Sequence, residues 1–259
     1  MQLSEHGMDT ARRRTSTRFR TLADEPVLLG SAVTVRDRFD TAGANERRST
    51  RTIGDLLARS SKHVIDTVIA AIVLLITAPV ILLLVLLIRI DSPGRALFPQ
   101  VRVGRRGRHF MCFKLRTMFA DADDRLSMLL RNDAHAQYEF ASSRKLKADP
   151  RVTRLGRFLR ATSLDELPQL WNVLRGDMSL VGPRPLVPDE LDNYGDHINV
   201  VLQVKPGLTG IWQVSGRNDL PYDVRVALDA DYAMNRTLWS DLQIIGRTIP
   251  ALLMRKGAY

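Results

Sequence analysis

Apolar positions are distributed unevenly along this chain of 259 residues, and the longest apolar block predicts a membrane element. The 22 consecutive residues from Thr67 to Ile88 carry no charge, and about 20 apolar residues suffice for a helix to span a bilayer. Pro79 lies inside this block, where it removes a backbone hydrogen bond and clashes with the preceding turn. The pattern therefore predicts an apolar helical segment that bends at Ala78-Pro79.

The cations that flank the block bear on its path through the membrane. Similar numbers precede it (Arg47, Arg48, Arg51, Arg59, Lys62) and follow it (Arg89, Arg95, Arg102, Arg105, Arg106, Arg108). A straight span places one basic group on the far side, contrary to the positive-inside tendency. We therefore expect residues 61–92 to form a re-entrant helix-break-helix, with a straight span as the alternative. Backbone groups freed at the bend need protein partners, and Thr77 offers one hydroxyl. Asp66 is expected to pair with Lys62 one turn earlier.

The rest of the chain alternates between strand-like and helical spacing. The runs LFPQVRV and RHFMCFKLRTM, between Ala96 and Met118, surround the turn Gly104-Arg105-Arg106-Gly107 and predict a β-hairpin. Residues 121–142, 163–175 and 222–256 have helical spacing. The last helix lies either flat at the lipid headgroup layer or in the protein core. These patterns predict an α+β, mainly helical fold.

Residues 1–60 show no sustained apolar period and contain basic clusters such as Arg12-Arg13-Arg14. This composition predicts a mostly disordered tail, which is either a solubilising extension or a basic arm on anionic lipid. The segment lacks the apolar core and cleavage site of a secretory signal, so we expect it to stay in the cytoplasm. Residues 93–259 are then a compact cytoplasmic domain with interfacial helices.

Charge points to an anionic partner. The chain has 38 Lys and Arg against 28 Asp and Glu, a formal net charge of +10. Between Arg144 and Arg160 seven cations face a single acid, Asp149, a density of like charge that costs self-repulsion unless it meets an anion. Nucleic acid is not expected, because Phe158 is the only aromatic platform in that run and no binding module is recognisable. The single cysteine, Cys112, excludes an intramolecular disulfide framework.

An acidic pair follows this basic run. Ser163-Leu164-Asp165-Glu166 precedes the apolar run LPQLWNVL, and Ser-x-x-Glu before such a run is a capping-box pattern. The alternative is phosphoryl chemistry, because a helix N-terminus favours anions. Asp165 would then be a nucleophile, and Glu166 would hold a divalent cation against phosphate oxygens. Rigid turns with cations follow at 182–185, 205–210 and 215–218, and the prolines around Arg184 would help to aim its guanidinium at a phosphate.

The order of these motifs resembles that of a known family. The run DPRVTRLGRFLRATSLDELPQLWNVLRGDMSLVGPRP (residues 149–185), with FKLRTM before it and PGLTGIWQVSGRN after it, is similar to the bacterial sugar transferases. These are monotopic phosphoglycosyl transferases of the bacterial inner membrane, active at its cytoplasmic face, which initiate exopolysaccharide and related glycans. The family transfers a sugar 1-phosphate from a UDP-sugar to polyprenyl phosphate and releases UMP. The likeness covers residues 62 to 259.

The resemblance also implies roles for individual residues. Asp165 would attack the β-phosphate of the donor to give a covalent phosphosugar intermediate, and Glu166 would bind Mg²⁺. The basic residues that match the family's motifs, and would bind the substrate phosphates, are Lys114, Arg116, Arg160, Arg184 and Arg217. For each arginine, a surface or structural ion pair is the alternative.

Two departures from the family pattern concern the membrane segment. This chain has Ala78-Pro79 and Lys62-His63 where many members have Ser-Pro and Lys-Arg. The segment QVSGRN and the ending RKGAY look most like members that use UDP-glucose or UDP-galactose. A non-catalytic membrane scaffold that binds acidic lipid or partner proteins is the competing hypothesis. The oligomeric state stays open, a homo-oligomer included.

Overall fold

The computed structural model describes residues 53–143, 146 and 149–254, all within one compact unit. Residues 1–52 of the predicted tail lie outside the described residues. The predicted boundary at residue 60 falls inside the first described helix, α2, which begins at Ile53.

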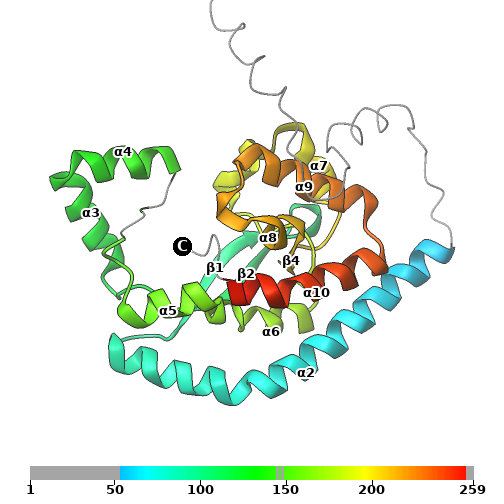
Figure 1. Ribbon diagram of the computed structural model, residues 1–259, viewed down its shortest axis with the longest axis horizontal. Helices are drawn as coiled ribbons and strands as arrows, with labels where there is room; N and C mark the ends of the chain where they lie inside the picture. The colour runs from blue at the N-terminus through cyan, green and yellow to red at the C-terminus, as the bar shows by residue number, and fades with distance from the viewer. Residues whose placement is uncertain (1–52, 144–145, 147–148, 255–259) are drawn as a thin grey trace, which may run out of the picture. The chain divides into compact units, whose positions relative to one another are not determined.

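Helix α2 (Ile53–Asp91) is 39 residues long and contains Pro79. It bends in its second half but continues through the proline, so the predicted helix-break-helix does not form two separate helices (Figure 1). Thr77 Oγ1 donates to the carbonyl oxygen of Val73 at 2.7 Å, a side-chain bond that often accompanies helix bending. The re-entrant path stays a prediction, whereas a long apolar helix is shown.

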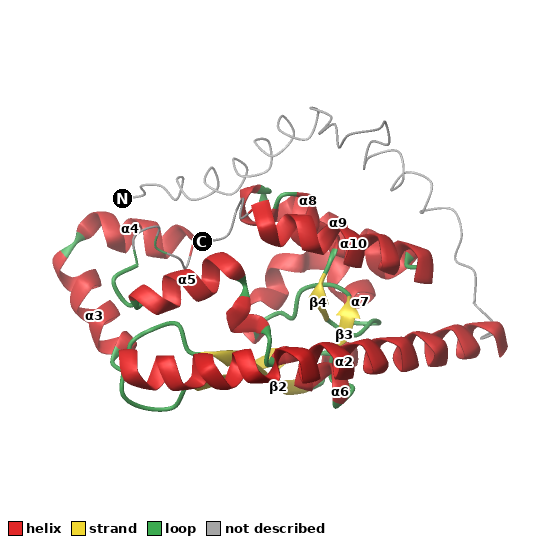
Figure 2. Ribbon diagram, turned by 60° about the horizontal axis from the view of Figure 1, so that its bottom comes forward, coloured by secondary structure: helices red, strands yellow, loops and turns green. Residues whose placement is uncertain are grey.

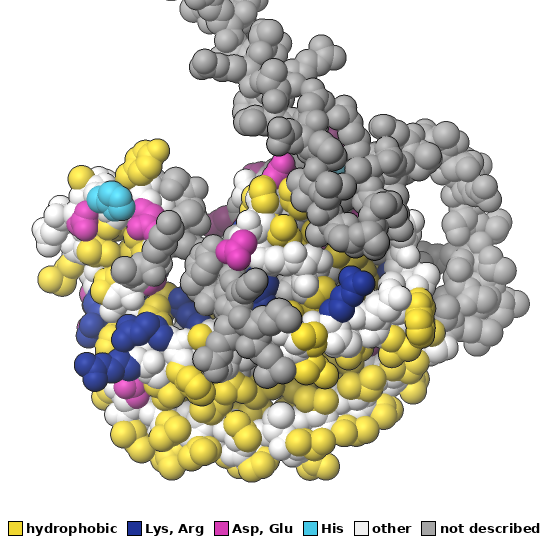
Figure 3. All heavy atoms as spheres, in the orientation of Figure 1, with side chains coloured by type: hydrophobic (Ala, Val, Ile, Leu, Met, Phe, Trp, Pro, Cys, Tyr) yellow, Lys and Arg dark blue, Asp and Glu magenta, His cyan; other side chains and the backbone are white. Residues whose placement is uncertain are grey.

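The apolar side chains of α2 lie mostly on the surface. The part from Ser60 to Asp91 is long and apolar enough to cross a membrane, and only 11% of its most apolar window is buried. Leu75, Leu82 and Ile90 are each more than two-thirds exposed. Figure 3 shows hydrophobic side chains gathered along the lower edge of the molecule, where α2 lies. An exposed apolar surface of this extent marks a membrane or protein contact.

The predicted hairpin is confirmed. Strands β1 (Leu97–Val103) and β2 (His109–Leu115) pair antiparallel, from Leu97 with Leu115 to Val103 with His109. The turn between them contains the short helix η2 (Arg105–Gly107), in which Arg106 and Gly107 have positive φ. Asn172 of α6 (Gln169–Leu174) is fully buried and ties β2 to that helix. Its Oδ1 accepts from the Phe113 N–H at 3.0 Å, and its Nδ2 donates to the Met111 carbonyl at 2.7 Å.

The expected helical regions are confirmed, with breaks that the spacing did not locate. Region 121–142 contains α3 (Ala122–Asn132) and all of α4 (Ala134–Ser143) except its last residue. Region 163–175 contains a short 3-10 helix and α6, and region 222–256 contains α9 (Tyr222–Asn235) and α10 (Leu238–Met254). The remaining elements are short: α5 (Arg154–Thr162), η3 (Leu164–Glu166), β3 (Ser179–Val181), η4 (Pro188–His197), α7 (Ile198–Val201), β4 (Gly207–Thr209), α8 (Ile211–Ser215) and η5 (Arg217–Asp219). Strands β3 and β4 pair in parallel.

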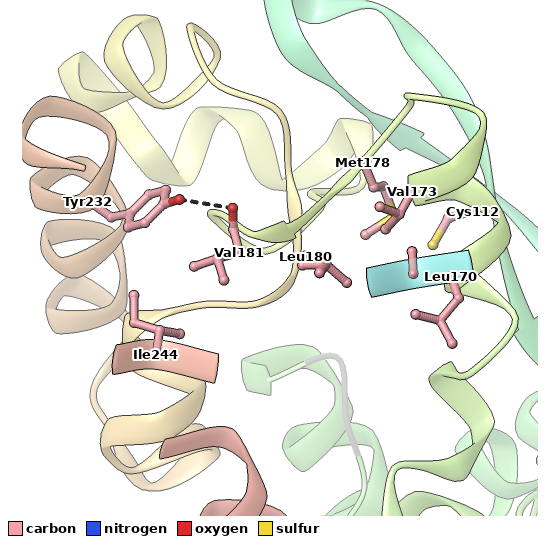
Figure 4. Packing of buried hydrophobic residues seen from close by; sticks show 9 residues of the cluster. Cys112, Leu170, Val173, Met178, Leu180, Val181, Tyr232 and Ile244 are labelled. Atoms are coloured by element: carbon pink, nitrogen blue, oxygen red, sulfur yellow. Dashed lines mark hydrogen bonds between the residues drawn. The ribbon is translucent and has the colours of Figure 1, made fainter. Parts of the chain in front are cut away.

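Two hydrophobic clusters attach the domain to α2. The first joins Ala70 of α2 to buried residues of β2, α6, β3, α9 and α10, several of which are drawn in Figure 4. The second joins Leu84 and Ile88 of α2 to Leu115 and Leu159. The hairpin and the chain after it therefore pack along much of α2, as Figure 2 also shows for β2 and α6.

Polar contacts also tie the start of α2 to the domain. Lys62 Nζ lies 3.4 Å from Asp66 Oδ2 and donates to Asp241 Oδ2 at 2.6 Å. Ser179 Oγ donates to Asp66 Oδ2 at 2.5 Å. The predicted Lys62–Asp66 pair is thereby confirmed.

Helix α10 was expected to lie either in the protein core or at the lipid headgroup layer, and it has both a buried and an exposed apolar face. Ile244 is buried in the first cluster, whereas Trp239 and Leu242 are 69% and 52% exposed. One face of α10 thus belongs to the core, and an apolar part of the other face stays on the surface. Contact of that face with lipid headgroups stays a prediction.

Candidate active site

The acidic pair lies in η3, between α5 and α6. Ser163 has φ 56° and ψ 18°, a left-handed conformation, and its N–H donates to the Arg160 and Leu159 carbonyls at the end of α5. The predicted capping box is wrong, because the Ser163 side chain makes no capping bond. Only its carbonyl accepts the Glu166 N–H, at 3.2 Å. The left-handed residue ends α5, as such residues commonly end helices, and turns the chain into η3.

Glu166 is paired with Lys114 of β2. The Lys114 Nζ lies 2.7 Å from Glu166 Oε1, and both side chains are about three-quarters or more buried. Burial opposes ionisation of Glu166, but the charges of Lys114 and Arg184 outweigh it and lower the pKa of this carboxyl. Glu166 is therefore a stable carboxylate at neutral pH.

Asp165 has the opposite environment. Burial raises the pKa of its carboxyl to about 6, repulsion from Glu166 adds to the rise, and the charges of Lys114 and Arg160 oppose it. The pKa values of these two adjacent carboxyl groups are thus shifted in opposite directions, a pattern that is common at functional sites. Above pH 6 Asp165 is an anion, although burial and the Glu166 charge make its ionised form unfavourable. Such a carboxylate suits a nucleophile that becomes phosphorylated.

A cleft beside Glu166 concentrates positive charge. Its lining includes three cations, Lys114, Arg184 and Arg102, together with the amides of Gln169 and Gln213. Cations that converge on one cleft next to a carboxylate favour an anion such as a diphosphate. The arrangement can neutralise a phosphate that would otherwise repel the acidic pair.

Arg102 was not among the residues assigned to the site from sequence. It is only 7% exposed, its Nη1 donates to the Pro185 carbonyl at 2.8 Å, and its Nη2 donates to Gln100 Oε1 at 2.7 Å. Burial lowers the pKa of its guanidinium, and the Arg184 charge adds to this effect. The strand alternation places Gln100 and Arg102 on the polar face, so the pattern gives no signal that Arg102 is buried.

Arg184 is held by the loop that follows β3. Its backbone N–H bonds Asp229, and its guanidinium lies 6.0 Å from the Trp212 ring centroid. Asp229 is 1% exposed and also accepts from Tyr194 Oη at 2.9 Å and Trp212 Nε1 at 3.2 Å. Burial raises the pKa of Asp229 to about 7 against these hydrogen bonds. This buried network fixes the loop that presents Arg184 to the cleft.

The other residues that were predicted to bind phosphate do not all lie near the acidic pair. Arg160 Nε donates to Thr117 Oγ1 at 3.0 Å, and its charge acts on Asp165. Arg116 donates to the carbonyl oxygens of Ser92 and Pro93, just after α2, and its role in phosphate binding stays a prediction. Arg217 has a positive φ of 54° in η5 and does not line the cleft. Lys114, Arg160 and Arg184 therefore gather near the acidic pair.

Two described cations of the basic run that precedes the pair bind partners other than the acidic pair. Arg151 makes a salt bridge with Asp149 at 2.8 Å, and Arg157 Nη1 donates to the Val152 carbonyl. Arg144, Lys145 and Lys147 lie outside the described residues. Of the described cations in this run, Arg160 is the one whose charge acts on Asp165.

The carboxylates present fit Mg²⁺ as a shared ligand. Within residues 53–143, 146 and 149–254 no three His, Cys, Asp or Glu side chains group as a metal site. Mg²⁺ is usually bound through one or two carboxylates plus substrate phosphates and water. Glu166 with the neighbouring Asp165 matches that donor set, and Mg²⁺ binding stays a prediction.

The acidic turn lies beside the long apolar helix α2. Leu164 packs against the cluster of Leu84 and Ile88, and Leu167 packs against the cluster that contains Ala70. The residues on both sides of the acidic pair therefore contact hydrophobic clusters that include α2.

Comparison with known proteins agrees with this geometry. The profile of the family described as bacterial sugar transferase matches residues 57–255. The chain belongs to this family. The match begins inside α2 and includes the hairpin, the acidic pair and the Arg184 loop.

Several curated relatives are similar over most of this chain. One is the undecaprenyl-phosphate galactose phosphotransferase of Salmonella typhimurium, 49% identical over 208 residues, which are 79% of this chain and 44% of the relative. Another is the exopolysaccharide production protein ExoY of Rhizobium meliloti, 44% identical over 83% of this chain and 93% of the relative. A third is the UDP-glucose:undecaprenyl-phosphate glucose-1-phosphate transferase of Caulobacter vibrioides, 45% identical over 76% and 72%. The chain thus spans less than half of the Salmonella relative and nearly all of ExoY.

Proposed function

We propose that this protein transfers a hexose 1-phosphate from a UDP-sugar to undecaprenyl phosphate, as the first membrane step of exopolysaccharide biosynthesis. The observation that carries the proposal is the Asp165-Glu166 turn, which combines a high-pKa and a low-pKa carboxyl beside a cationic cleft and on an apolar helix. The relatives' names add support, because they specify galactose and glucose phosphotransfer to undecaprenyl phosphate.

In the first half-reaction, Lys114, Arg184 and Arg102 bind the diphosphate of the donor in the cleft. Their charges offset the repulsion between the diphosphate and the acidic pair. An Asp165 carboxylate oxygen attacks the β-phosphorus, and the bond from this phosphorus to the bridging oxygen breaks. UMP leaves, and the hexose phosphate remains bound to Asp165 as an acyl phosphate.

In the second half-reaction, a phosphate oxygen of undecaprenyl phosphate attacks the same phosphorus. The bond between phosphorus and the Asp165 oxygen breaks, which restores the carboxylate and yields the lipid-linked sugar diphosphate. Two displacements let one small site serve a soluble donor and a lipid acceptor in turn. Position on α2 brings the site to the surface where the acceptor phosphate lies.

Glu166, with the neighbouring Asp165, would hold Mg²⁺. When bound there, Mg²⁺ would neutralise phosphate charge and orient the diphosphate. The Lys114 ammonium also binds the Glu166 carboxylate and keeps it ionised with or without Mg²⁺.

The membrane topology belongs to the same proposal. We infer that α2 enters and leaves the cytoplasmic leaflet, with its bend at Pro79, so that the chain on both sides stays in the cytoplasm of a bacterial inner membrane. The balanced flanking cations and the site's contact with both ends of the apolar stretch support this path.

The proposal is tested by UMP release from the full-length protein in membranes, with UDP-glucose or UDP-galactose and undecaprenyl phosphate. We expect release with one of these donors and its loss in Asp165→Asn. Asp223→Asn, which removes an exposed carboxylate on α9, is the matched control and should keep the wild-type rate. An Asp165→Asn protein with an unchanged rate would reject the mechanism, and absence of release with both sugars would favour the scaffold hypothesis.

A further inference from the structure

The cleft beside the acidic pair contains two side chains that the proposed reaction does not use. Its three cations bind the diphosphate in that reaction, and Glu166 would hold Mg²⁺. The lining also includes the uncharged side chains of Gln169 and Gln213. The oxygen of a side-chain amide accepts hydrogen bonds, so an ionised phosphate oxygen cannot be its partner. Such an oxygen in a cationic cleft calls for an O–H or N–H group of the ligand.

The two amides differ in how they are engaged. Gln213 Nε2 donates to the Leu208 carbonyl at 3.3 Å, and its Oε1 is buried. Gln169 is only 2% exposed, yet its side chain forms no hydrogen bond with any residue that the structure describes. Neither its amide nitrogen nor its amide oxygen is fully enclosed, and the residue lines the cleft. Because a buried amide without a partner is costly, Gln169 gains from a ligand that offers both a donor and an acceptor.

The position of Gln169 indicates which part of the donor it meets. It is the first residue of α6 and follows Glu166 by three positions within a run of helical turns, so the two side chains share a face. Asp165 attacks the β-phosphorus in the proposed reaction, and the hexose is bonded to that phosphate. The uracil is separated from it by the α-phosphate and the ribose. The hexose is therefore the neutral part of the donor nearest to Gln169.

The chemistry around the anomeric carbon selects one hexose atom. The ring oxygen and the glycosidic oxygen accept hydrogen bonds but cannot donate them. The C2 hydroxyl, on the carbon next to the one that carries the phosphate, is the first group along the sugar that can donate to an amide oxygen. The amide nitrogen can donate at the same time to a β-phosphate oxygen beside that hydroxyl. Glucose and galactose have the same configuration at C2, so this contact suits either donor.

We propose that Gln169 is a specificity-determining residue, whose Oε1 accepts a hydrogen bond from the C2 hydroxyl of the donor hexose while its Nε2 donates to a β-phosphate oxygen. The inference rests on the proposed function, because it places a UDP-hexose in the cleft. It adds recognition of the sugar to the residues that bind the phosphates. A site of this kind disfavours a donor without the hydroxyl, because the amide oxygen then has no partner.

The test compares two donors by isothermal titration calorimetry of the full-length protein in detergent. The donors are UDP-glucose or UDP-galactose, whichever releases UMP, and its 2-deoxy analogue, and every protein carries Asp165→Asn so that the donor stays intact. With Gln169 present, we expect the 2-deoxy donor to bind about fivefold more weakly, which corresponds to one uncharged hydrogen bond. Gln169→Met should bind both donors equally. Gln169→Asn, whose amide is one methylene shorter, should also lose the preference.

A matched control and the ratio of affinities separate recognition from folding. Gln137→Met changes an exposed glutamine of α4 and should keep the fivefold preference. A change in fold alone lowers both affinities and leaves their ratio unchanged, and Gln169→Asn decides the matter if Gln169→Met does not fold.

Three results would overturn the inference. Equal binding of the two donors when Gln169 is present would exclude the C2 contact while leaving sugar-phosphate transfer intact, because UMP release tests transfer separately. A preference that persists in Gln169→Met and Gln169→Asn, with both donors weakened, would assign Gln169 to the nucleotide, the phosphates or the fold. Absence of binding by either donor would reject the proposed function together with this inference.

Discussion

Two neighbouring carboxyl groups with opposite pKa shifts define the chemistry at the scale of single residues. Lys114 stabilises the Glu166 carboxylate, and burial raises the pKa of Asp165 to about 6. The sequence identified both acids and Lys114 but not the difference between the two carboxyl pKa values, because burial and the distances to the neighbouring cations decide it. The sequence does not reveal which partner a charged side chain has or how exposed it is. Arg102 is buried, and Arg116 bonds two backbone carbonyls, and neither could be read from the pattern.

The Asp165 pKa predicts the pH dependence of the donor half-reaction. Protonation below about pH 6 removes the nucleophile, so single-turnover UMP release should fall about tenfold per pH unit well below 6. Rapid-quench measurements from pH 4.5 to 8 check this. The break should persist in Asp229→Asn, because Asp229 titrates at about 7 and lies outside the acidic turn. A flat profile through pH 6 would contradict the assignment.

As the pH falls, Asp165 and Glu166 change the free energy of unfolding in opposite directions. Asp165 has a raised folded-state pKa, so its ionisation destabilises the fold above 6, and this cost is relieved as the pH falls from 6 towards 4. Glu166 has a lowered pKa, so its stabilisation is present above its unfolded value of about 4.3 and is lost as the pH falls through its folded pKa. In Asp165→Asn, the stability gained by the wild type between pH 6 and 4 should disappear from urea unfolding curves.

A third residue-scale prediction concerns Asn172, which ties the strand that carries Lys114 to α6. Asn172→Leu removes the partners of the buried Phe113 N–H and Met111 carbonyl, which should cost about 1–3 kcal/mol for each unsatisfied group. The variant should unfold at lower denaturant, and its transfer rate should fall because β2 and Lys114 shift against α6. Unchanged stability would mean that water replaces the amide. Asn235→Leu, at an exposed amide of α9, is the control.

At the scale of elements, close packing of α5 places Arg160 near Asp165. A Cβ added at Gly156 would lie 1.9 Å from the Thr117 carbonyl oxygen, so this helix can approach the segment after β2 only with glycine there. Gly156→Ala should destabilise the protein by about 1–3 kcal/mol and displace α5. Gly246→Ala in α10 meets nothing within 4 Å and should stabilise by about 1 kcal/mol. Melting temperatures that move in the same direction would refute this packing account.

The pattern predicted elements where local spacing decides the structure. The hairpin follows from alternation around Gly104-Arg105-Arg106-Gly107, and the apolar helix follows from its length alone. The capping box failed because Ser163 adopts a left-handed conformation that ends α5, a tertiary outcome that Ser-x-x-Glu does not encode. A second cleft was not visible in the sequence because its four cations come from four separate segments (Lys62, Arg105, Lys205 and Arg236).

At the scale of the whole molecule, the account requires both ends of α2 to lie on one side of the membrane. Single cysteines placed at Arg51 and at Arg108, in a chain whose buried Cys112 is replaced by Ala, can be labelled from either side of sealed vesicles. We expect both to react only from the cytoplasmic side. Labelling of the two positions from opposite sides would establish a straight span and refute the re-entrant path.

The most direct test of the central claim is the covalent state of Asp165. The full-length protein should be mixed with its UDP-hexose donor in the absence of acceptor, digested, and examined by mass spectrometry. We predict that the peptide with Asp165 gains the mass of a hexose phosphate, and that added undecaprenyl phosphate removes it. A donor that releases UMP in Asp165→Asn, or a modification on another residue, would contradict the account.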